Sequence, residues 1–398
     1  MRRATIVVTC ALVLGTGLTA SAGAVPRASL TLPARGAFYY PWFPETWTVN
    51  GQHVFYHPTL SYYNSSTSAV VDEHVRALDY ALVDIAIASW FGVGTHSESV
   101  RIPLLLDRTD ALASPLTWTL YYEQEGKPTN PTVEQIQSDL AYISTNYATK
   151  PVYAHISGKP VIFVYNVGDG CEVVDRWNQA GAGAWYVVFK LFTGWRDCPT
   201  QPDAWHQYGP STAEQSHSPQ SFVISPGSWH ADEPAPRLAR DLARWQQSIR
   251  NMVASQAKWQ LVTTFNEWGE GTAVEHATEW GAPPYGEYIE ALHTNGQIPT
   301  AVVLRTASGS RTGSGVRLRW RTGSESHLLG FKLYREQNGT RLRLNRTVIP
   351  AARSDRAGRS YSWVDRRAPR NRALRYWLEA VSLSGARTWH GPILAAAG

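Results

Sequence analysis

Apolar runs of strand length recur between residue 37 and about residue 295, and they are continuous rather than alternating. Continuous apolar runs are typical of parallel strands that are covered on both faces. The runs are residues 38–42, 83–90, 117–123, 161–166, 184–192, 204–208, 222–226 and 261–267. Helix-type spacing of apolar residues separates several of them, at 68–81, 132–146 and 236–257. Eight strands with intervening helices predict an α/β fold, the (β/α)8 TIM barrel.

A doubly wound open sheet is the structural alternative to the barrel. No glycine-rich phosphate loop follows the first apolar run, and this disfavours the open sheet. After residue 298 the pattern changes to short, alternating, arginine-rich segments separated by Gly, Ser and Asn, at 316–320, 330–335 and 376–381. Such alternation predicts a small all-β sandwich. We therefore expect a barrel domain over 25–297 and a sandwich over 298–398.

The first residues have the pattern of a secretory signal. Arg2 and Arg3 precede an apolar stretch over 6–18, and residues 22–24 (Ala-Gly-Ala) fit the cleavage site. We expect residues 1–24 to be removed on export, with a retained anchor as the alternative. No other segment is apolar and long enough to cross a bilayer, so no membrane partner is expected after cleavage and the mature protein should be extracellular.

Composition narrows the class of partner. The chain has 398 residues and a net charge of +5, but its basic residues are not interleaved with nucleic-acid motifs, so no nucleic-acid partner is expected. It also has 17 Trp and 19 Tyr. Flat aromatic rings stack on sugars and also fill cores, and both uses are expected here. A polysaccharide or glycan is the expected partner, bound by a monomer.

Three cysteines are present, and Cys10 leaves with the signal. Cys171 and Cys198 remain as an even pair in an exported protein, which favours a disulfide, with two unpaired buried thiols as the alternative. Two cysteines without matching histidines do not make a zinc site, and we expect no metal.

Polar and aromatic residues gather where the predicted strands end. Because catalytic and binding residues of a barrel lie at the carboxyl ends of its strands, these residues are candidates for one sugar-binding cleft. The candidate substrate-binding residues are Tyr40, Trp42, Trp90, Glu123, Tyr165, Asn166, Tyr208, Asn266 and Trp268.

Glu267 and Glu270 carry the candidate chemistry. Glycoside cleavage needs a proton donor for the leaving oxygen and a second group acting near the anomeric carbon, and two carboxyl groups suit these roles. The two glutamates lie three residues apart after an apolar strand, and Gly269 and Gly271 allow a tight turn that points both into one cleft. Two surface glutamates in a glycine-rich loop are the alternative.

Residues 264–275 (TFNEWGEGTAVE) resemble glycoside hydrolase family 99, whose best-known members are endo-acting α-mannosidases. Residues 39–42, 89–92 and 122–123 resemble other strand ends of that family. The resemblance implies a retaining endo-glycosidase without metal or organic cofactor that works through the substrate's own 2-hydroxyl and a 1,2-anhydro sugar. It implies that Glu267 is the base assisting this hydroxyl. It implies that Glu270 is the general acid and then the base that activates water.

The sugar stays open, because Gly269 and Tyr121 stand where that family usually has His. The C-terminal region resembles fibronectin type III modules through the strand that bears Trp320 and the Tyr-Trp-Leu at 376–378. Two other functions are kept as hypotheses. One is a secreted carbohydrate-binding protein whose barrel has lost catalysis, and the other is an adhesion role centred on the sandwich.

Overall fold

A computed structural model describes residues 29–94, 97–126, 129–165, 170–281, 284–297, 303–325, 328–337, 339–351, 359–382 and 387–397. The expected signal at 1–24 and the candidate Asn166 lie outside these residues. Two compact units are present, one holding the chain up to 241 together with 252–289, the other 242–251 and the chain from 290 onward. No helix within the described ranges is long and apolar enough to cross a membrane.

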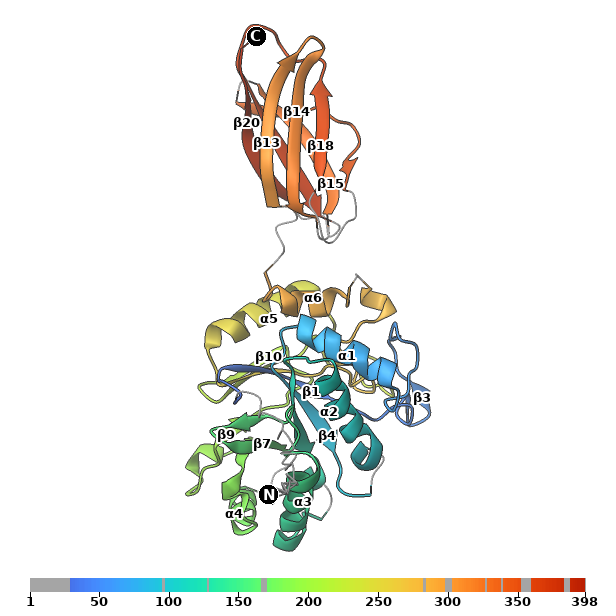
Figure 1. Ribbon diagram of the computed structural model, residues 1–398, viewed down its shortest axis with the longest axis vertical. Helices are drawn as coiled ribbons and strands as arrows, with labels where there is room; N and C mark the ends of the chain where they lie inside the picture. Colours follow the sequence, from blue (N-terminus) through green and yellow to red (C-terminus); the bar gives the residue numbers. More distant parts are fainter. Residues whose placement is uncertain are drawn as a thin grey trace, which may run out of the picture. The chain divides into compact units, whose positions relative to one another are not determined.

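The first unit is built on a nearly closed, barrel-like parallel sheet (Figure 1). Its parallel strands are β1 (Ala34–Tyr39), β4 (Ile85–Trp90), β5 (Thr117–Tyr122), β7 (Lys159–Val164), β8 (Tyr186–Lys190), β9 (Ala204–His206), β11 (Ser221–Ile224) and β12 (Trp259–Val262). β11 and β12 pair next to β1, and β9 lies beside β11 without a hydrogen-bonded ladder. The mixed α/β barrel-type fold predicted by the apolar runs is thus confirmed, with one gap in the ring.

Two short antiparallel strands extend this sheet. β10 (Glu214–His217) pairs with β11, and β6 (His155–Ile156) pairs with β7. Between β8 and β9, where every residue is described, a 3-10 turn at Trp195–Asp197 takes the place of an α-helix. Pro199 and Pro202 lie in this connection, and proline lacks the N–H that a helix interior needs.

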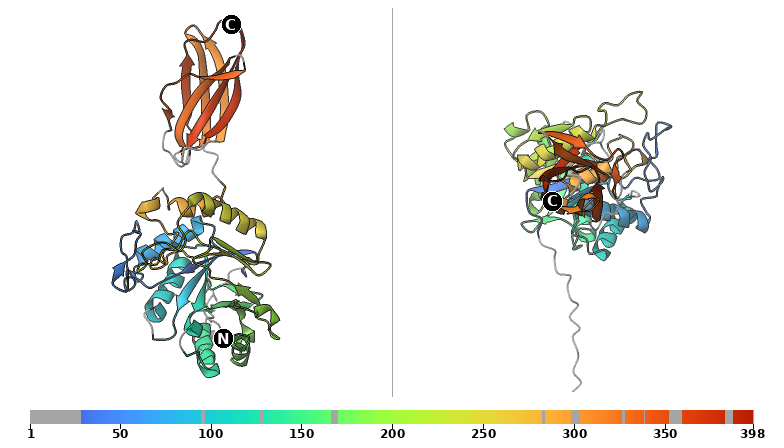
Figure 2. Two further views of the ribbon diagram at one scale, coloured as in Figure 1. Left: turned by 180° about the vertical axis from the view of Figure 1, so that it is seen from behind. Right: turned by 90° about the horizontal axis from the view of Figure 1, so that it is seen from above.

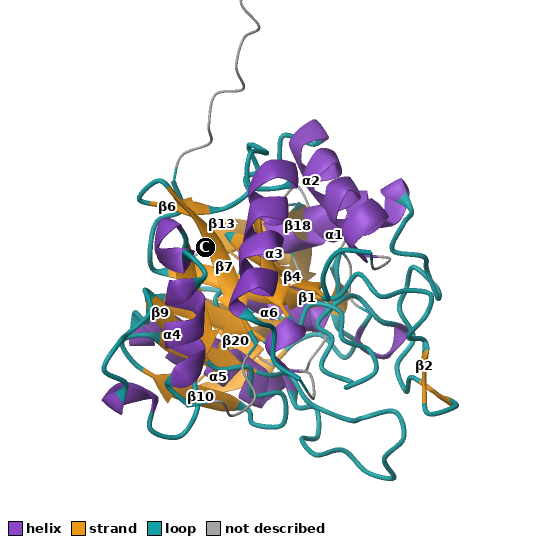
Figure 3. Cartoon of the chain, turned by 90° about the horizontal axis from the view of Figure 1, so that it is seen from below, coloured by secondary structure: helices purple, strands orange, loops and turns teal. Residues whose placement is uncertain are grey.

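The α-helices of the described chain are α1 (Ser68–Tyr80), α2 (Ile102–Ala111), α3 (Val133–Asn146), α4 (Glu172–Gln179), α5 (Leu242–Ser255) and α6 (Glu287–His293). Helices α1 to α4 lie around the strands of the first unit (Figure 3), and α1, α3 and α5 correspond to the three predicted helical stretches. In α1, Val71, Val75 and Leu78 are buried at helical spacing, as the sequence pattern requires. The hydroxyl of Thr132 accepts from the Gln135 N–H at 3.2 Å and begins α3 where the sequence predicts.

Several predicted boundaries were wrong. The first strand, expected over 38–42, is Ala34–Tyr39, and the strand expected over 184–192 is Tyr186–Lys190. The helix expected over 236–257 is Leu242–Ser255, and before it Leu238 forms a backbone bridge with Ser228. The last strand, expected over 261–267, ends at Val262. After Val262 the backbone bonds to the following loop. The N–H of Thr264 donates to the carbonyl of Thr272, and the carbonyl of Phe265 accepts from the N–H of Glu275 at 2.8 Å. Glu267 therefore lies in a loop after the strand rather than on its last residue.

Aromatic rings fill the interior of the barrel. Phe38 of β1 contacts the rings of Tyr121 and Tyr208 at centroid distances of 4.9 and 5.1 Å. Phe163 of β7 contacts Trp259 at 4.9 Å and His206 at 5.1 Å. The interior is therefore a packed core, and a cavity lies above it, at the carboxyl ends of the strands.

The second unit contains two antiparallel sheets packed face to face (Figure 2). One sheet is β13 (Val303–Thr312), β14 (Gly315–Ser324) and β18 (Ser360–Asp365). The other is β16 (Thr340–Arg343), β15 (Leu328–Gln337), β19 (Leu374–Ser382) and β20 (Arg387–Ala395), with β17 (Ile349–Pro350) paired to β15. Trp320, Phe331 and Tyr361 pack between the sheets at centroid distances of 5.1 to 5.4 Å. The alternating pattern predicted this all-β architecture.

The unit boundary differs from the predicted domain boundary at 297/298. Residue 298 lies outside the described chain, and residues 290–297 group with 242–251 of α5. The Arg250 guanidinium donates to the carbonyl of Gly296, which ties these two segments together. The sequence showed only the composition change near 298 and gave no signal for this pairing.

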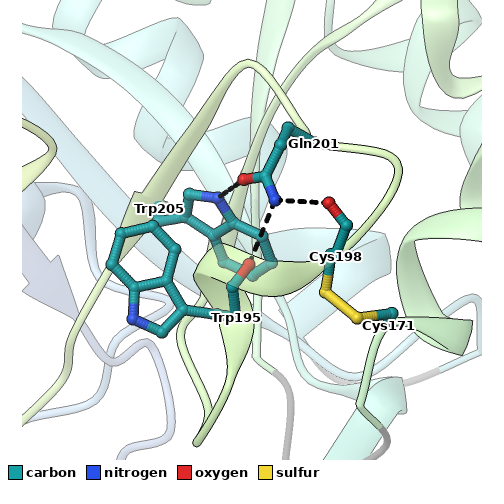
Figure 4. Close-up of a disulfide and its surroundings, with 5 residues drawn as sticks. All are labelled: Cys171, Trp195, Cys198, Gln201 and Trp205. Atoms are coloured by element: carbon teal, nitrogen blue, oxygen red, sulfur yellow. Dashed lines mark hydrogen bonds between the residues drawn. A yellow bond between two sulfur atoms is a disulfide. The ribbon is translucent and has the colours of Figure 1, made fainter.

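A disulfide joins Cys171, the residue before α4, to Cys198 in the loop between β8 and β9, with 5.3 Å between the Cα atoms. Gln201 braces the same loop (Figure 4). Its amide donates to the carbonyls of Trp195 and Cys198 at 3.1 and 2.9 Å, and its oxygen accepts from the Trp205 indole at 2.8 Å. The bond thus fixes a connection that has no α-helix to hold it.

We predict that replacing both Cys171 and Cys198 by Ser lowers the free energy of unfolding by about 3 kcal/mol. Closing a loop of 27 residues removes conformational entropy from the unfolded chain by roughly that amount. Urea unfolding of the variant and the oxidised wild type measures the difference. Equal stability of the two proteins would contradict the prediction.

Candidate active site

A cavity of about 480 Å³ lies at the carboxyl ends of the barrel strands. Loops and strand ends from distant parts of the first unit form its wall. It is lined by Tyr40, Trp42, Thr46, Thr48, Val49, Phe91, Tyr121, Glu123, Tyr165, Tyr208, His230, Glu267, Gly269 and Glu270. The structure therefore brings together both candidate catalytic residues and, of the candidate sugar-binding residues, Tyr40, Trp42, Glu123, Tyr165 and Tyr208.

Three other candidates are not among the described residues that line this cavity. Trp90, Asn266 and Trp268 are each fully buried. The Trp90 ring packs against Tyr122, with centroids 5.6 Å apart. Trp90 ends β4, where alternate residues point to opposite faces of the sheet. Asn266 and Trp268 lie in the loop after β12, and their side chains bond to Tyr40, Tyr63 and Glu275 instead of lining the cavity.

Asn266 fastens the last barrel strand to the first. Its side-chain oxygen accepts from the backbone N–H of Tyr40 at 2.7 Å, and its amide donates to the backbone carbonyl of Tyr40 at 3.0 Å. The side chain thus replaces a backbone partner where the β1–β12 ladder has ended. Asn266 is a positioning residue, since it holds Tyr40 on the cavity wall.

Residues 264–275 form a closed loop that carries both glutamates. Thr264 and Thr272 pair across its base, with a 3.2 Å backbone bond and hydroxyls 3.0 Å apart. The N–H of Glu267 donates to the Thr264 hydroxyl at 2.8 Å, and its carbonyl accepts from the N–H of Thr272 at 3.2 Å. A backbone bond from Gly271 to Trp268 closes the turn at the tip. Glu267 and Glu270 are thereby fixed on one turn beside one cavity.

Two glycines let the chain pass where a side chain would collide. Gly271 has a φ of +63°, and a Cβ there would lie 2.5 Å from the carbonyl oxygen of Trp229. A Cβ at Gly269 would lie 2.9 Å from Glu267 Oε1 and 3.0 Å from Val49. The close approach allows the N–H groups of Trp229 and Ala231 to bond the carbonyls of Glu270 and Gly269 at 2.8 and 2.9 Å, which brings His230 to the cavity.

Glu275 anchors the loop from behind. Its carboxylate is buried and accepts from the Tyr63 hydroxyl at 2.7 Å and the Trp268 indole at 3.1 Å. Its other oxygen meets His74 Nε2 at 3.1 Å, and His74 Nδ1 meets the Tyr39 hydroxyl at 2.9 Å. The role of Trp268 is therefore to hold the loop in place, with its ring stacked near Trp280 at 6.1 Å.

Glu267 is buried in this loop. Its Oε1 accepts from the Gly269 N–H at 3.0 Å, and its Oε2 has no hydrogen-bond partner among the described residues. Burial, followed by repulsion from the neighbouring Glu270 charge, raises the pKa of Glu267 well above its ordinary value. Burial and mutual repulsion therefore disfavour the state in which both carboxyl groups are charged.

Glu270 lies on the more open side of the pair and has more polar neighbours. Its Oε2 accepts from the Tyr208 hydroxyl at 3.0 Å, and that hydroxyl accepts from Tyr40 at 2.9 Å. Burial raises the pKa of Glu270, whereas the Tyr208 hydrogen bond and the charges of His230, Arg237 and Lys190 lower it. The two glutamates thus experience different environments, as an acid/base pair requires.

Glu123 supplies a third carboxyl group. It follows β5, and its Oε1 accepts from the Ser89 hydroxyl at 2.9 Å. Burial raises the pKa of Glu123 to about 8, against the lowering effects of the Ser89 hydrogen bond and the Lys190 charge. Glu123 is therefore protonated near neutral pH and can donate a hydrogen bond to a ligand oxygen.

Sequence reasoning missed several residues at this site. Lys190 is the last residue of β8, and its Nζ lies 4.1 Å from the centre of the Tyr165 ring. Its place at a strand end was a usable signal. Val49 lies in the hairpin of β2 (Thr48–Val49) and β3 (Gln52–His53), and His230 lies in a loop. The Asn50-Gly51 pair, typical of a tight hairpin turn, was the usable signal for the hairpin.

His206, the last residue of β9, is not among the described residues that line the cavity. It is fully buried in the barrel core, its Nε2 lies 3.1 Å from the Tyr121 hydroxyl, and burial lowers its pKa to about 3. Within the described ranges, no group of three or more His, Cys, Asp or Glu side chains is arranged to hold a metal ion.

Comparison with known proteins gives distant likenesses. No protein-family model and no curated protein matches the chain. Among solved structures, a GH99 endo-α-mannosidase from Bacteroides thetaiotaomicron is 19% identical over 67% of this chain and 96% of its own, with a TM-score of 0.49. A glycoside hydrolase-like protein is 16% identical over 69% and 98%, with a TM-score of 0.48. An Fn3-like protein from Clostridium thermocellum is 14% identical over 25% and 96%, with a TM-score of 0.18. Similarity at this level does not place the chain in a family, and the function is argued from the site.

We predict that Glu275→Ala lowers the free energy of unfolding by about 3 kcal/mol or more. The change leaves the Tyr63 hydroxyl and the Trp268 indole buried without their acceptor. The control is Glu279→Ala, which removes an exposed carboxylate paired with His57 at 2.6 Å and should cost about 1 kcal/mol or less. Denaturant unfolding of both variants tests this, and a similar cost for the two would refute it.

We predict that Glu123 makes wild-type stability fall with rising pH. Its folded pKa of about 8 exceeds the ordinary value of 4.5, so between these values folding takes up a proton. Glu123→Gln removes this group, and the stability of the variant relative to wild type should rise by up to about 1.4 kcal/mol per pH unit over that window. Unfolding free energies at pH 5 and pH 8 measure it. A difference between the two proteins that does not change with pH would sink the prediction.

Proposed function

We propose that this protein is a glycoside hydrolase that uses Glu267 and Glu270 as its acid/base pair. The observation that carries the proposal is that both carboxyl groups line one cavity, on one turn, with their titrations coupled by proximity. Glycosidic bond cleavage needs such a pair, with one group protonated and one ionised at the start. The proposed chemistry uses only these side chains and the substrate itself.

A carbohydrate fits the rest of the cavity wall. Trp42, Phe91 and Tyr165 offer ring faces, with Trp42 and Phe91 in contact at 5.6 Å, and all three are partly exposed at the cavity. Sugar C–H faces stack on such rings. Glu123 and the Tyr40–Tyr208 hydroxyl pair supply polar groups that can meet sugar hydroxyls. An aromatic wall with a few fixed polar groups is typical of a small-molecule or glycan site.

The motif at 264–275 supports a finer proposal. By its resemblance to family 99, the bond cut is internal and α-linked, and the configuration at the anomeric carbon is retained. Glu267 takes the proton of the substrate's 2-hydroxyl, which attacks the anomeric carbon while Glu270 protonates the leaving oxygen. Water activated by Glu270 then opens the anhydro sugar. Because no carboxylate attacks carbon, the usual rule relating carboxylate separation to stereochemistry does not apply.

These roles require Glu270 to be protonated and Glu267 to be ionised when substrate is bound. In the free protein, the deeper burial of Glu267 favours the proton on Glu267. A sugar hydroxyl that donates to the unpartnered Oε2 of Glu267 stabilises its charged form, since hydrogen bonding to a carboxylate lowers its pKa. The proton then moves to Glu270, where the leaving oxygen accepts it. Substrate binding thus sets the acid and the base.

We also propose that the protein is exported and acts on an extracellular polysaccharide or glycan. The pattern of residues 1–24 supports export, and the Cys171–Cys198 disulfide suits an oxidising compartment. We propose that it works as a monomer.

The test of hydrolysis is product analysis on α-mannans, α-glucans and bacterial wall polysaccharides. We predict that wild type cuts one of them and that Glu270→Gln lowers kcat by about 100- to 10,000-fold while binding persists. Glu279→Gln, at an exposed site away from the cavity lining, serves as the control and should retain wild-type turnover. If wild type binds a polysaccharide but cuts none, the carbohydrate-binding protein replaces the enzyme.

The division of roles has its own test. On an aryl glycoside with a dinitrophenolate leaving group, no proton is needed for departure, so Glu270→Gln should recover much of its bond-cleavage rate. Glu267→Gln should stay slow on the same compound, because activation of the 2-hydroxyl is still missing. The opposite order of recovery would exchange the two roles. Pre-steady-state release of the phenolate measures both.

A further inference from the structure

Three arginines lie in a row on the outer face of the second unit. β14 alternates buried Val316, Leu318 and Trp320 with outward-facing residues. The outward residues are Arg317, Arg319 and Arg321, of which the last two are exposed and the first is partly exposed. Side chains two residues apart on one strand are spaced by about 6.7 Å. The row therefore presents three evenly spaced guanidinium groups along one line.

Hydroxyl side chains border this row on both sides. In the register of β13, the residues opposite the arginines carry hydroxyl groups, and β18 adds two more on the other side. The pairs are Arg317 with Ser310, Arg319 with Ser308 and Ser362, and Arg321 with Thr306 and Ser360. All five hydroxyl residues are exposed. Most of this face borders a shallow hollow of about 390 Å³.

Acidic partners are missing for the row. Among the described residues, no ion pair or hydrogen bond involves the side chains of Arg317, Arg319 or Arg321. Two acids close to the row, Glu325 after β14 and Asp365 opposite Val316 in β18, have other partners. Glu325 accepts from the Tyr361 hydroxyl at 2.7 Å, and Asp365 accepts from Arg335 at 2.5 Å. The three positive charges are thus available to a ligand.

The opposite sheet shows how differently its cations are arranged. Lys332 and Arg387 pair with Glu379 at 3.3 and 3.6 Å, and Arg375 pairs with Glu336 at 3.6 Å. Arg341 lies over the Trp377 ring at 3.8 Å. Cations on that face are neutralised or stacked, so the unpaired row is a property of the β13–β14–β18 face and not of arginine content.

We propose that the arginine row binds an acidic polysaccharide through its uronate carboxylates, at a site separate from the barrel cavity. The planar guanidinium matches a carboxylate with two parallel hydrogen bonds. The flanking Ser and Thr hydroxyls both donate and accept, as sugar hydroxyls require. Binding there does not depend on catalysis. It holds the enzyme on a charged polymer and raises the local concentration of glycan at its cavity.

Three other polymers fit this face less well. Neutral polysaccharides and single-stranded nucleic acids bind on exposed aromatic platforms. The outward residues described on this face are arginines, hydroxyl residues and Val364, whereas Trp320 and Tyr361, which also border the hollow, pack inward against Phe331. Double-stranded DNA is contacted by elements that enter a groove, and a flat sheet face with one row of charges offers none. Charge together with hydroxyls, and not stacking, is what this face supplies.

The experiment measures binding of the full chain, carrying Glu270→Gln to prevent cleavage, to polygalacturonate by isothermal titration. The test variant is R317S/R319S/R321S. The control is R341S/R375S/R387S, which removes three exposed arginines from the opposite sheet with the same change in net charge. Each lost exposed contact should weaken binding about threefold, so the test variant should raise Kd by roughly 20- to 30-fold and the control by about twofold or less.

Three further arms decide the chemistry. Fully methyl-esterified polygalacturonate has the same backbone without charge and should not bind. Double-stranded DNA should bind wild type more weakly than polygalacturonate does. A lysine triple variant, R317K/R319K/R321K, keeps the charge but loses the bidentate geometry, so it should bind polygalacturonate more weakly than wild type. If the serine variant is less heat-stable than wild type, the lysine variant replaces it as the test of the site.

Equal losses of affinity for polygalacturonate in the test and control variants would show an effect of net charge alone and would contradict the proposed site. So would unchanged binding in the test variant, binding of the methyl ester, or tighter binding of DNA. None of these results bears on hydrolysis, which is measured at the barrel cavity with wild-type enzyme. The two proposals can therefore fail separately.

Discussion

Two buried carboxyl groups held beside one cavity constrain the rest of the barrel unit. Glu267 and Glu270 repel when both are charged, and burial penalises each charge, so the fold must hold them together against electrostatic cost. Backbone hydrogen bonds within residues 264–275 hold the pair, and among the described residues no cationic side chain forms an ion pair with Glu267. A pair held this way resists carrying two negative charges at once, which suits acid/base cleavage.

The support for this pair extends well behind the cavity. Glu275 gathers Tyr63, Trp268 and His74 into one buried hydrogen-bonded cluster, and Asn266 ties the loop to Tyr40 at the end of β1. Apart from Tyr40, these residues are not among those that line the cavity, yet they fix where the two glutamates point. The rigid loop fits a site whose catalytic groups must be in place before the substrate arrives.

The sequence predicted the layout of the barrel and the position of the two candidate glutamates at one cavity, because both follow from local patterns. Continuous apolar runs mark buried parallel strands, and Glu267 follows such a run closely. It could not predict which neighbours face the cavity. Trp90 and Trp268 were chosen because they follow predicted strands. Whether such a side chain faces the cavity depends on where the strand stops pairing. Backbone pairs such as Thr264 with Thr272 determine that point, and local sequence does not show them. Val49 and His230 reach the cavity through a hairpin and a loop–loop contact that leave little local signal.

The most direct test of the central claim is a carbon-detected NMR titration of the glutamate carboxyl groups, with Glu267 and Glu270 assigned through their Gln variants. The account predicts two well-separated steps, each seen at both carbons, with the later step above the ordinary glutamate value of 4.5. It also predicts that removing either group shifts the titration of the other downward. Two independent single-step titrations near the ordinary glutamate pKa would show that the two groups do not influence each other, and would contradict the account.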